Sequence, residues 1–188
     1  MTRIQDNSNF FFQLFLNCER SFKFDQIFGP DSNQEVLFES TVKSGLTKLL
    51  LPETEVSSAA VLAYGQTGTG KTYTMGTDIR LEDDVKHILL NLFQNSQHFF
   101  CFQFSSSDRG LIPRVISEIF GKIGQETSVR ISFFEILNEK VFDLLKPSNI
   151  KVPLRIKEEG NGFSIPELSN KVVGIEQEAL ALLERVSP

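Results

Sequence analysis

A glycine-rich segment that follows a short apolar run constrains this chain more than any other feature. The segment is Gly65-Gln66-Thr67-Gly68-Thr69-Gly70-Lys71-Thr72. The glycines let successive backbone N–H groups point inward at an anion, because side chains there would block its approach. Lys71 can reach the β- and γ-phosphates of a nucleotide, and the Thr72 hydroxyl can ligate magnesium. The segment therefore predicts a phosphate loop that binds a purine nucleoside triphosphate with magnesium.

The residues on both sides of the loop support this prediction. The apolar run before it predicts a strand buried on both faces, Ala59-Ala60-Val61-Leu62-Ala63-Tyr64. A helix is expected to open at Lys71 and to stop at Gly76, and its dipole would add to the anion site. The order of strand, phosphate loop and helix predicts an α/β layered fold of the P-loop NTPase type, with a central, mostly parallel or mixed sheet flanked by helices.

Three further helices are predicted from capping patterns and helical periodicity. Ser32 and Glu35 form a capping-box pattern at the start of a helix over residues 33–50. A second helix is expected to begin at Pro113 and to stop at Gly124. A last helix is expected over residues 176–185, where alanine and leucine recur on one face.

Strands are predicted where apolar and polar residues alternate. Residues 22–24 predict a short strand, and residues 129–133 a half-buried one. Residues 154–156 and 163–165 flank a Gly-Asn-Gly sequence and predict a hairpin.

Composition excludes several classes of protein. The chain has 188 residues, which suits one domain or part of a larger one. Its net charge of −5, with no basic stripe, argues against a nucleic-acid partner. Two cysteines are too few for a disulfide framework. No apolar run approaches the roughly 18 residues of a membrane span, and no secretory signal is recognised, so we expect an intracellular protein without a membrane partner.

Beyond the bare phosphate-loop pattern, residues 63–75 resemble the signature of the kinesin motor domain. The run is Ala63-Tyr64-Gly65-Gln66-Thr67-Gly68-Thr69-Gly70-Lys71-Thr72-Tyr73-Thr74-Met75. Four other segments are similar to the family in the same order: 22–28, 34–38, 110–114 and 132–145. In the last of these, Leu137 stands where the family has tyrosine.

The resemblance implies an ATP-driven motor that moves along microtubules. It implies ATP and magnesium as cofactors, tubulin as partner, and a cytoplasmic, cytoskeletal location. It also implies that Tyr73 presents its ring to the adenine base. It implies no oligomeric state, and no heptad run is present to predict a coiled coil.

Some parts of the family pattern are not found. The Arg-x-Arg-Pro strand of the family has no counterpart in residues 1–18, which we leave unassigned. The Ser-Ser-Arg-Ser-His and Asp-x-Ala-Gly-x-Glu segments, which sense the γ-phosphate and position water, are also not found. We therefore expect residues 19–188 to be a partial motor domain, and we assign no catalytic residue, which leaves enzymatic activity open.

Residues 77–109 match nothing in the family pattern and are more numerous than its usual loop. They are either an enlarged surface loop with its own helix or translated noncoding sequence, and the second interpretation is favoured.

Two other functions remain as alternatives. A small-molecule phosphotransferase would need arginines over the γ-phosphate, for which Arg80, Arg109 and Arg114 are candidates. A nonenzymatic scaffold would keep the early half of the motor without needing nucleotide.

Basic residues flank the predicted hairpin, in a region that helps contact the microtubule in the family. They are Arg155, Lys157 and Lys171, with Glu158, Glu159 and Glu167 among them. The mixture favours a solvated face of both charge signs.

Overall fold

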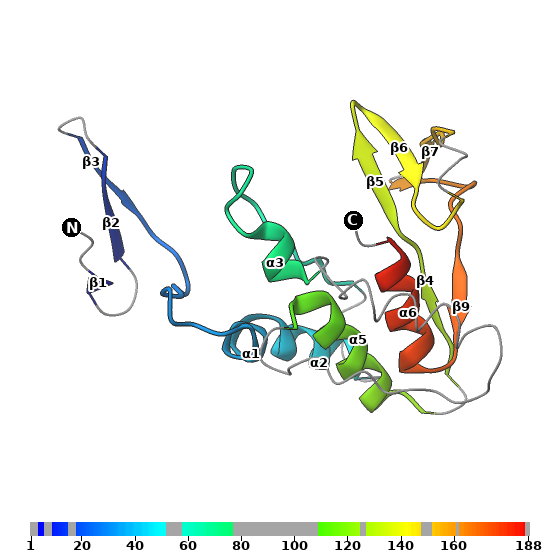
Figure 1. Ribbon diagram of the computed structural model, residues 1–188, viewed down its shortest axis with the longest axis horizontal. Helices are drawn as coiled ribbons and strands as arrows, with labels where there is room; N and C mark the ends of the chain where they lie inside the picture. The colour runs from blue at the N-terminus through cyan, green and yellow to red at the C-terminus, as the bar shows by residue number, and fades with distance from the viewer. Residues whose placement is uncertain are drawn as a thin grey trace, which may run out of the picture.

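The computed structural model describes residues 4–5, 9–14, 18–51, 58–76, 109–124, 127–147, 152–160 and 162–186 (Figure 1). Its first three strands are described as backbone only. They are β1 (Ile4–Gln5), β2 (Asn9–Leu14) and β3 (Cys18–Phe22), and they form an antiparallel sheet in the order β1-β2-β3. The predicted strand at 22–24 is wrong beyond its first residue, because β3 ends at Phe22.

The helix predicted over residues 33–50 is present, with a π-helical segment inside it. It consists of α1 (Gln34–Leu37), η1 (Phe38–Val42) and α2 (Lys43–Leu50). Two hydroxyls bond to carbonyls one turn back, from Ser40 to Val36 at 2.7 Å and from Thr41 to Leu37 at 2.6 Å. Such side-chain bonds compete with the regular helical ladder, which accounts for the π-helical geometry at this point.

The predicted capping box at Ser32 is wrong, because the next residue caps the helix. The Oδ1 atom of Asn33 accepts from the Val36 amide at 2.8 Å. Asn33 has extended backbone dihedrals and satisfies one of the free amides of the first turn. An asparagine amide and a serine hydroxyl cap helices about equally well, so the pattern alone did not separate the two adjacent residues.

The short helix after the phosphate loop is confirmed. It is α3 (Lys71–Met75), and it ends at Gly76, which has a φ of 78°. This left-handed conformation is the usual end of a helix and favours glycine.

The buried strand predicted over residues 59–64 is wrong. These residues are not paired with any described strand, and the Leu62 side chain is 90% exposed and that of Tyr64 101% exposed. A strand becomes buried on both faces only when neighbouring strands and helices cover it, and no described element covers this segment.

Helix α5 (Leu111–Lys122) packs against two apolar clusters with two rows of side chains. Leu111, Val115 and Ile119 face the first cluster, which is centred on Phe38 and Leu46 of the helical segment 34–50. The helix begins two residues before the predicted start at Pro113. Proline is tolerated there because the first amides of a helix have no intrahelical partner.

The second row of α5 packs against the last helix and a pair of strands. Ile116 of α5 lies with Val173 of β9 (Lys171–Val173) and with Ala179 and Leu183 of α6 (Glu176–Val186). Strand β4 (Val129–Ile131) pairs with β9 and adds its apolar side chains to this cluster. The predictions of α6 and of the half-buried strand at Val129 are confirmed, although β4 ends at Ile131.

Two hairpins follow β4. Strands β5 (Phe134–Leu137) and β6 (Lys140–Asp143) pair through a turn at Asn138 and Glu139, whose φ angles are 49° and 63°. Two consecutive positive φ angles are typical of a type I′ hairpin turn. The sequence did not predict this hairpin.

The hairpin predicted around residues 160–162 is confirmed, with its arms shifted. Strand β7 (Lys157–Glu159) pairs with β8 (Gly162–Ser164), and Leu154 instead forms an isolated bridge with Val141 of β6. All strand pairs in the described residues are antiparallel. The described part of the chain thus forms helices and small sheets rather than one central sheet, and none of its helices is long and apolar enough to cross a membrane.

The backbone of Gly76 touches the backbone of Gly110, which joins the end of α3 to the start of α5. A Cβ atom placed on Gly76 would lie 2.7 Å from the Cα atom of Gly110 and 2.8 Å from its nitrogen. Only a residue without a side chain permits this approach. The contact also closes the segment 77–109, whose interior lies outside the described residues.

The carboxylate of Asp143 joins the end of β6 to the loop before β9. Its Oδ1 atom accepts from the Leu145 amide and its Oδ2 atom from the Ser169 amide, each at 2.8 Å. Partial burial acts to raise the pKa of Asp143, but the hydrogen bonds from Ser169 and Leu145 and the charge of Lys146 outweigh it. The net result is a pKa below the ordinary value of 3.8.

Gly76→Ala should destabilise the chain by about 2 kcal/mol or more, because it adds a backbone clash and forces alanine to a positive φ. The free energy of unfolding from urea titration followed by circular dichroism measures this. Gly121→Ala is the matched control. A Cβ at Gly121 meets nothing within 4 Å, and alanine in the last turn of α5 should stabilise by at most about 0.5–1 kcal/mol. Equal effects of the two substitutions would contradict the glycine contact.

Asp143→Asn should cost about 1–3 kcal/mol at neutral pH, because an amide donor then faces the Ser169 amide. A lowered pKa means that the carboxylate stabilises the fold above its ordinary pKa and ceases to do so as the pH falls through the folded value. Urea midpoints of the variant and the parent chain should therefore converge as the pH falls through the lowered pKa of Asp143. Asp31→Asn, on an exposed turn, is the control, and a difference that stays constant with pH would refute the role of the charge.

Candidate phosphate-binding loop

The predicted phosphate loop forms a tight turn that leads into α3. The Gln66 carbonyl accepts from the Thr69 amide at 3.4 Å and from the Thr69 hydroxyl at 2.9 Å. Gly68 and Gly70 have φ angles of 83° and 89°, in the left-handed region that favours glycine. In Figure 1 the loop extends from α3 away from α1 and α5. Two of the motif's glycines are thus required by the backbone conformation itself.

The ammonium group of Lys71 lies against the first residues of the loop. Its Nζ atom donates to the Gly65 carbonyl at 2.8 Å and to the Gln66 carbonyl at 2.6 Å. These bonds link the start of α3 to the start of the loop. They also place a positive charge at the position where the loop's backbone turns.

The residues predicted to bind the nucleotide form one continuous turn followed by the first turn of α3. Gly65, Gly70 and Lys71 are half-buried. The remaining ones are exposed to solvent: Gln66, Thr67, Gly68, Thr69, Thr72 and Tyr73. A ligand of the loop can therefore approach it from solvent, with the Thr72 hydroxyl and the Tyr73 ring accessible.

The dipole of α3 adds little to the anion site. Helix α3 has five residues, so few peptide dipoles are aligned toward the loop. The attraction of an anion to this site rests mainly on the loop amides and on Lys71.

The loop residues fit a triphosphate with magnesium. A Cβ atom at Gly68 or Gly70 would meet nothing within 4 Å, so the space beside both glycines is open. Backbone amides, one ammonium and one hydroxyl are the donors that such loops use for phosphate oxygens and for the metal. Among the described residues no three His, Cys, Asp or Glu side chains gather to hold a metal. Thr72, which is exposed at the start of α3, carries a hydroxyl of the kind that such loops offer to magnesium.

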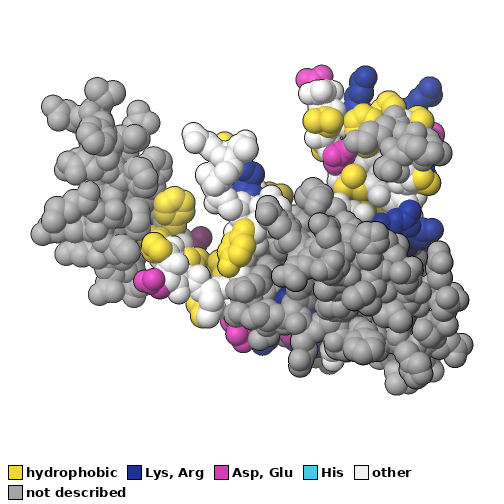
Figure 2. Space-filling view, in the orientation of Figure 1, with side chains coloured by type: hydrophobic (Ala, Val, Ile, Leu, Met, Phe, Trp, Pro, Cys, Tyr) yellow, Lys and Arg dark blue, Asp and Glu magenta, His cyan; other side chains and the backbone are white. Residues whose placement is uncertain are grey.

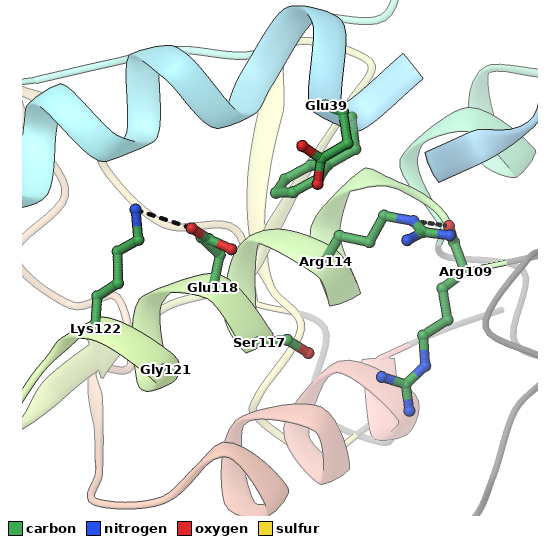
Figure 3. Close-up of a pocket in the computed structure, with 8 residues that line it drawn as sticks. Glu39, Arg109, Arg114, Ser117, Glu118, Gly121 and Lys122 are labelled. Atoms are coloured by element: carbon green, nitrogen blue, oxygen red, sulfur yellow. Dashed lines mark hydrogen bonds and ion pairs between the residues drawn. The ribbon is translucent and has the colours of Figure 1, made fainter. Parts of the chain in front are cut away.

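A cavity of about 390 Å³ lies elsewhere, between η1 and α5 (Figure 3). Its lining includes Arg109 and Arg114 but no residue of the phosphate loop. The Arg114 Nε atom donates to the Arg109 carbonyl at 2.8 Å, and Lys122 pairs with Glu118 at 2.9 Å. Arg114 and Lys122 are thus engaged within the protein, and the cavity lined by both candidate arginines of the phosphotransferase alternative has no phosphate-loop residue in its lining. Arg80 lies outside the described residues.

The hairpin face has both charge signs, as predicted. Strand β7 is fully exposed and carries Lys157 beside Glu158 and Glu159, while Lys171 is exposed on β9. Figure 2 shows basic, acidic and hydrophobic side chains intermingled over this part of the molecule. A surface of this kind has no single-sign patch to attract an acidic partner.

Comparison with known proteins gives consistent matches. A sequence profile described as the kinesin motor domain matches residues 15–187. Kinesin-like protein KIP1 of Saccharomyces cerevisiae is 36% identical over 144 residues, which cover 75% of this chain and 12% of the relative. Kinesin-like protein KIN-5C of Arabidopsis thaliana is 34% identical over 184 residues, which cover 91% of this chain and 16% of the relative.

A solved structure also matches, and it is described as "Structure of a fast kinesin: Implications for ATPase mechanism and interactions with microtubules". It has a TM-score of 0.72 at 27% identity, and the match covers 98% of this chain and 46% of that chain. This match and the family profile fit a P-loop NTPase-type α/β fold and confirm the predicted class, although the described residues form helices and small sheets rather than its central sheet. More particularly, the chain belongs to the kinesin motor-domain family, and it spans a small part of the length of its curated relatives.

Proposed function

We propose that residues 65–73 bind Mg-ATP. The observation that carries this proposal is the loop conformation, in which Gly68 and Gly70 adopt left-handed dihedrals and Lys71 lies against the turn. The amides of residues 65–70 would hold phosphate oxygens, and Lys71 would contact the β- and γ-phosphates. Thr72 would ligate magnesium, and the exposed Tyr73 ring would stack on adenine. Magnesium, when bound, would neutralise charge on the phosphates.

We further propose that the whole protein of which these residues are part is a microtubule motor. Membership of the kinesin motor-domain family supports coupling of ATP hydrolysis to movement on tubulin, and a cytoplasmic, cytoskeletal location. The residues described here would contribute nucleotide binding to that activity. Family membership rather than the mixed-charge hairpin face supports tubulin as the partner.

The phosphotransferase alternative is not favoured. It needs arginines above the γ-phosphate, whereas Arg109 and Arg114 line the separate cavity beside α5. An assay for phosphate transfer from ATP to candidate acceptors should detect no product. The scaffold alternative predicts the same protein partners for the parent chain and for Lys71→Ala.

Lys71→Ala should weaken binding of Mg-ATP by about 10- to 100-fold, the loss expected for one charge-assisted hydrogen bond to phosphate. Isothermal titration calorimetry with Mg-ATP measures the dissociation constant. Lys140→Ala is the matched control, because it removes the same charge from an exposed position on the β5–β6 hairpin. If Lys71→Ala binds as tightly as the control, the assignment of residues 65–73 fails.

Thr72→Ala should weaken binding only when magnesium is present, because the hydroxyl acts through the metal. ATP titrations in excess magnesium and in EDTA separate the two conditions. Thr127→Ala, which changes an exposed threonine outside the loop, is the control. A loss of affinity at Thr72 that is equal in EDTA would mean that its hydroxyl is not a metal ligand.

A further inference from the structure

Gln34 links the first turn of α1 to the helix after the phosphate loop. Its side chain is 3% exposed, and its Nε2 atom donates to the Tyr73 carbonyl at 2.7 Å. The two residues are 39 positions apart in the chain, so the bond is a tertiary one. Gln34 is the one buried polar residue in the described part of the chain.

The Tyr73 carbonyl needs this donor because α3 is short. In a longer helix, the amide four residues further on would donate to this carbonyl. Helix α3 ends at Met75, and Gly76 turns the chain into the left-handed region, so the regular helical bonds end with the one that the Gly76 amide donates to the Thr72 carbonyl at 2.9 Å. The next carbonyl along the chain, that of Tyr73, accepts a hydrogen bond from the side-chain amide of Gln34. The glutamine amide thus replaces the next turn of the helix.

The orientation of the Gln34 amide follows from its surroundings. With the oxygen and nitrogen exchanged, two oxygens would face each other at the Tyr73 carbonyl, which is repulsive. In the observed orientation the Oε1 atom has no hydrogen-bond partner in the described residues. Gln34 and Tyr73 both line a small pocket of about 170 Å³, which has room for solvent beside them. The bond to Tyr73 therefore determines how the side chain is placed.

Other contacts hold α3 at its far end. Met75 packs into the apolar cluster around Phe38, and Gly76 touches Gly110. The Tyr73 ring is 58% exposed, so packing restrains it only in part. The backbone of Tyr73, from which the ring projects, is restrained by Gln34.

We propose that Gln34 is a positioning residue for the base of the nucleotide, and that it acts by holding the backbone of Tyr73. This inference rests on the proposed binding of Mg-ATP by residues 65–73. The sequence placed Gln34 in a segment that resembles the family but gave it no role. Its burial and its bond to Tyr73 are properties of the tertiary structure.

Gln34→Glu tests the proposal, because it keeps the shape of the side chain and replaces the donor with an acceptor. Calorimetric titrations use Mg-ATP and Mg-tripolyphosphate, which has the phosphates without a base. We expect the variant to bind Mg-ATP about tenfold more weakly. Its affinity for Mg-tripolyphosphate should stay within about twofold of the parent, since the loop that holds the phosphates is unchanged. Gln26→Glu makes the same change at an exposed position and should alter neither affinity.

A second comparison uses Tyr73→Ala, which keeps the carbonyl and removes the ring. If Gln34 acts through the ring, adding Gln34→Glu to Tyr73→Ala should not further lower the ratio of the affinity for Mg-ATP to the affinity for Mg-tripolyphosphate. Equal losses for both ligands, or no loss for either, would overturn the positioning role. If the parent chain itself binds neither ligand, the proposed function fails together with this inference, and that result is distinct from the other two.

Discussion

The packing of α5 against two apolar clusters holds the helices and the β4–β9 pair of this chain together. Its two rows of side chains lie one residue apart along the sequence, Leu111, Val115 and Ile119 in one and Ile112, Ile116 and Phe120 in the other. One row meets η1 and α2, and the other meets α6 and β9. A helix that is apolar on two sides must be covered on both. Because Met75 joins the first of these clusters, α5 also supports the phosphate-loop helix.

Support for the phosphate loop is unequal at its two ends. On the C-terminal side, α3 is held by Met75, by the contact of Gly76 with Gly110 and by the bond from Gln34 to Tyr73. On the N-terminal side, the segment before Gly65 pairs with no strand among the described residues, and Val61, Leu62 and Tyr64 are exposed. Within the loop itself, the bonds from Lys71 to the first two carbonyls connect the two sides.

The local part of this arrangement could be predicted from the sequence, and the tertiary part could not. The glycine spacing predicts the turn and the short α3, because left-handed dihedrals and a helix stop are local properties of glycine. The amphipathic rows predict α5 and α6. The prediction of a buried strand over residues 59–64 is wrong because an apolar run becomes a buried strand only when distant segments pair with it. For the same reason the contact between Gly76 and Gly110 and the role of Gln34 had no signal in the sequence.

The unequal support has a consequence for binding. A ligand that bridges the loop amides and Lys71 fixes both sides of the loop, and any freedom lost on the exposed N-terminal side opposes the gain from the phosphate contacts. The Lys71 bonds to Gly65 and Gln66 must also be exchanged for bonds to phosphate. Any interaction that covers residues 61–64 would reduce the loss of freedom on the N-terminal side of the loop, because burying Val61 and Leu62 is favourable in its own right. We therefore expect covering of residues 61–64 and binding of nucleotide to favour each other.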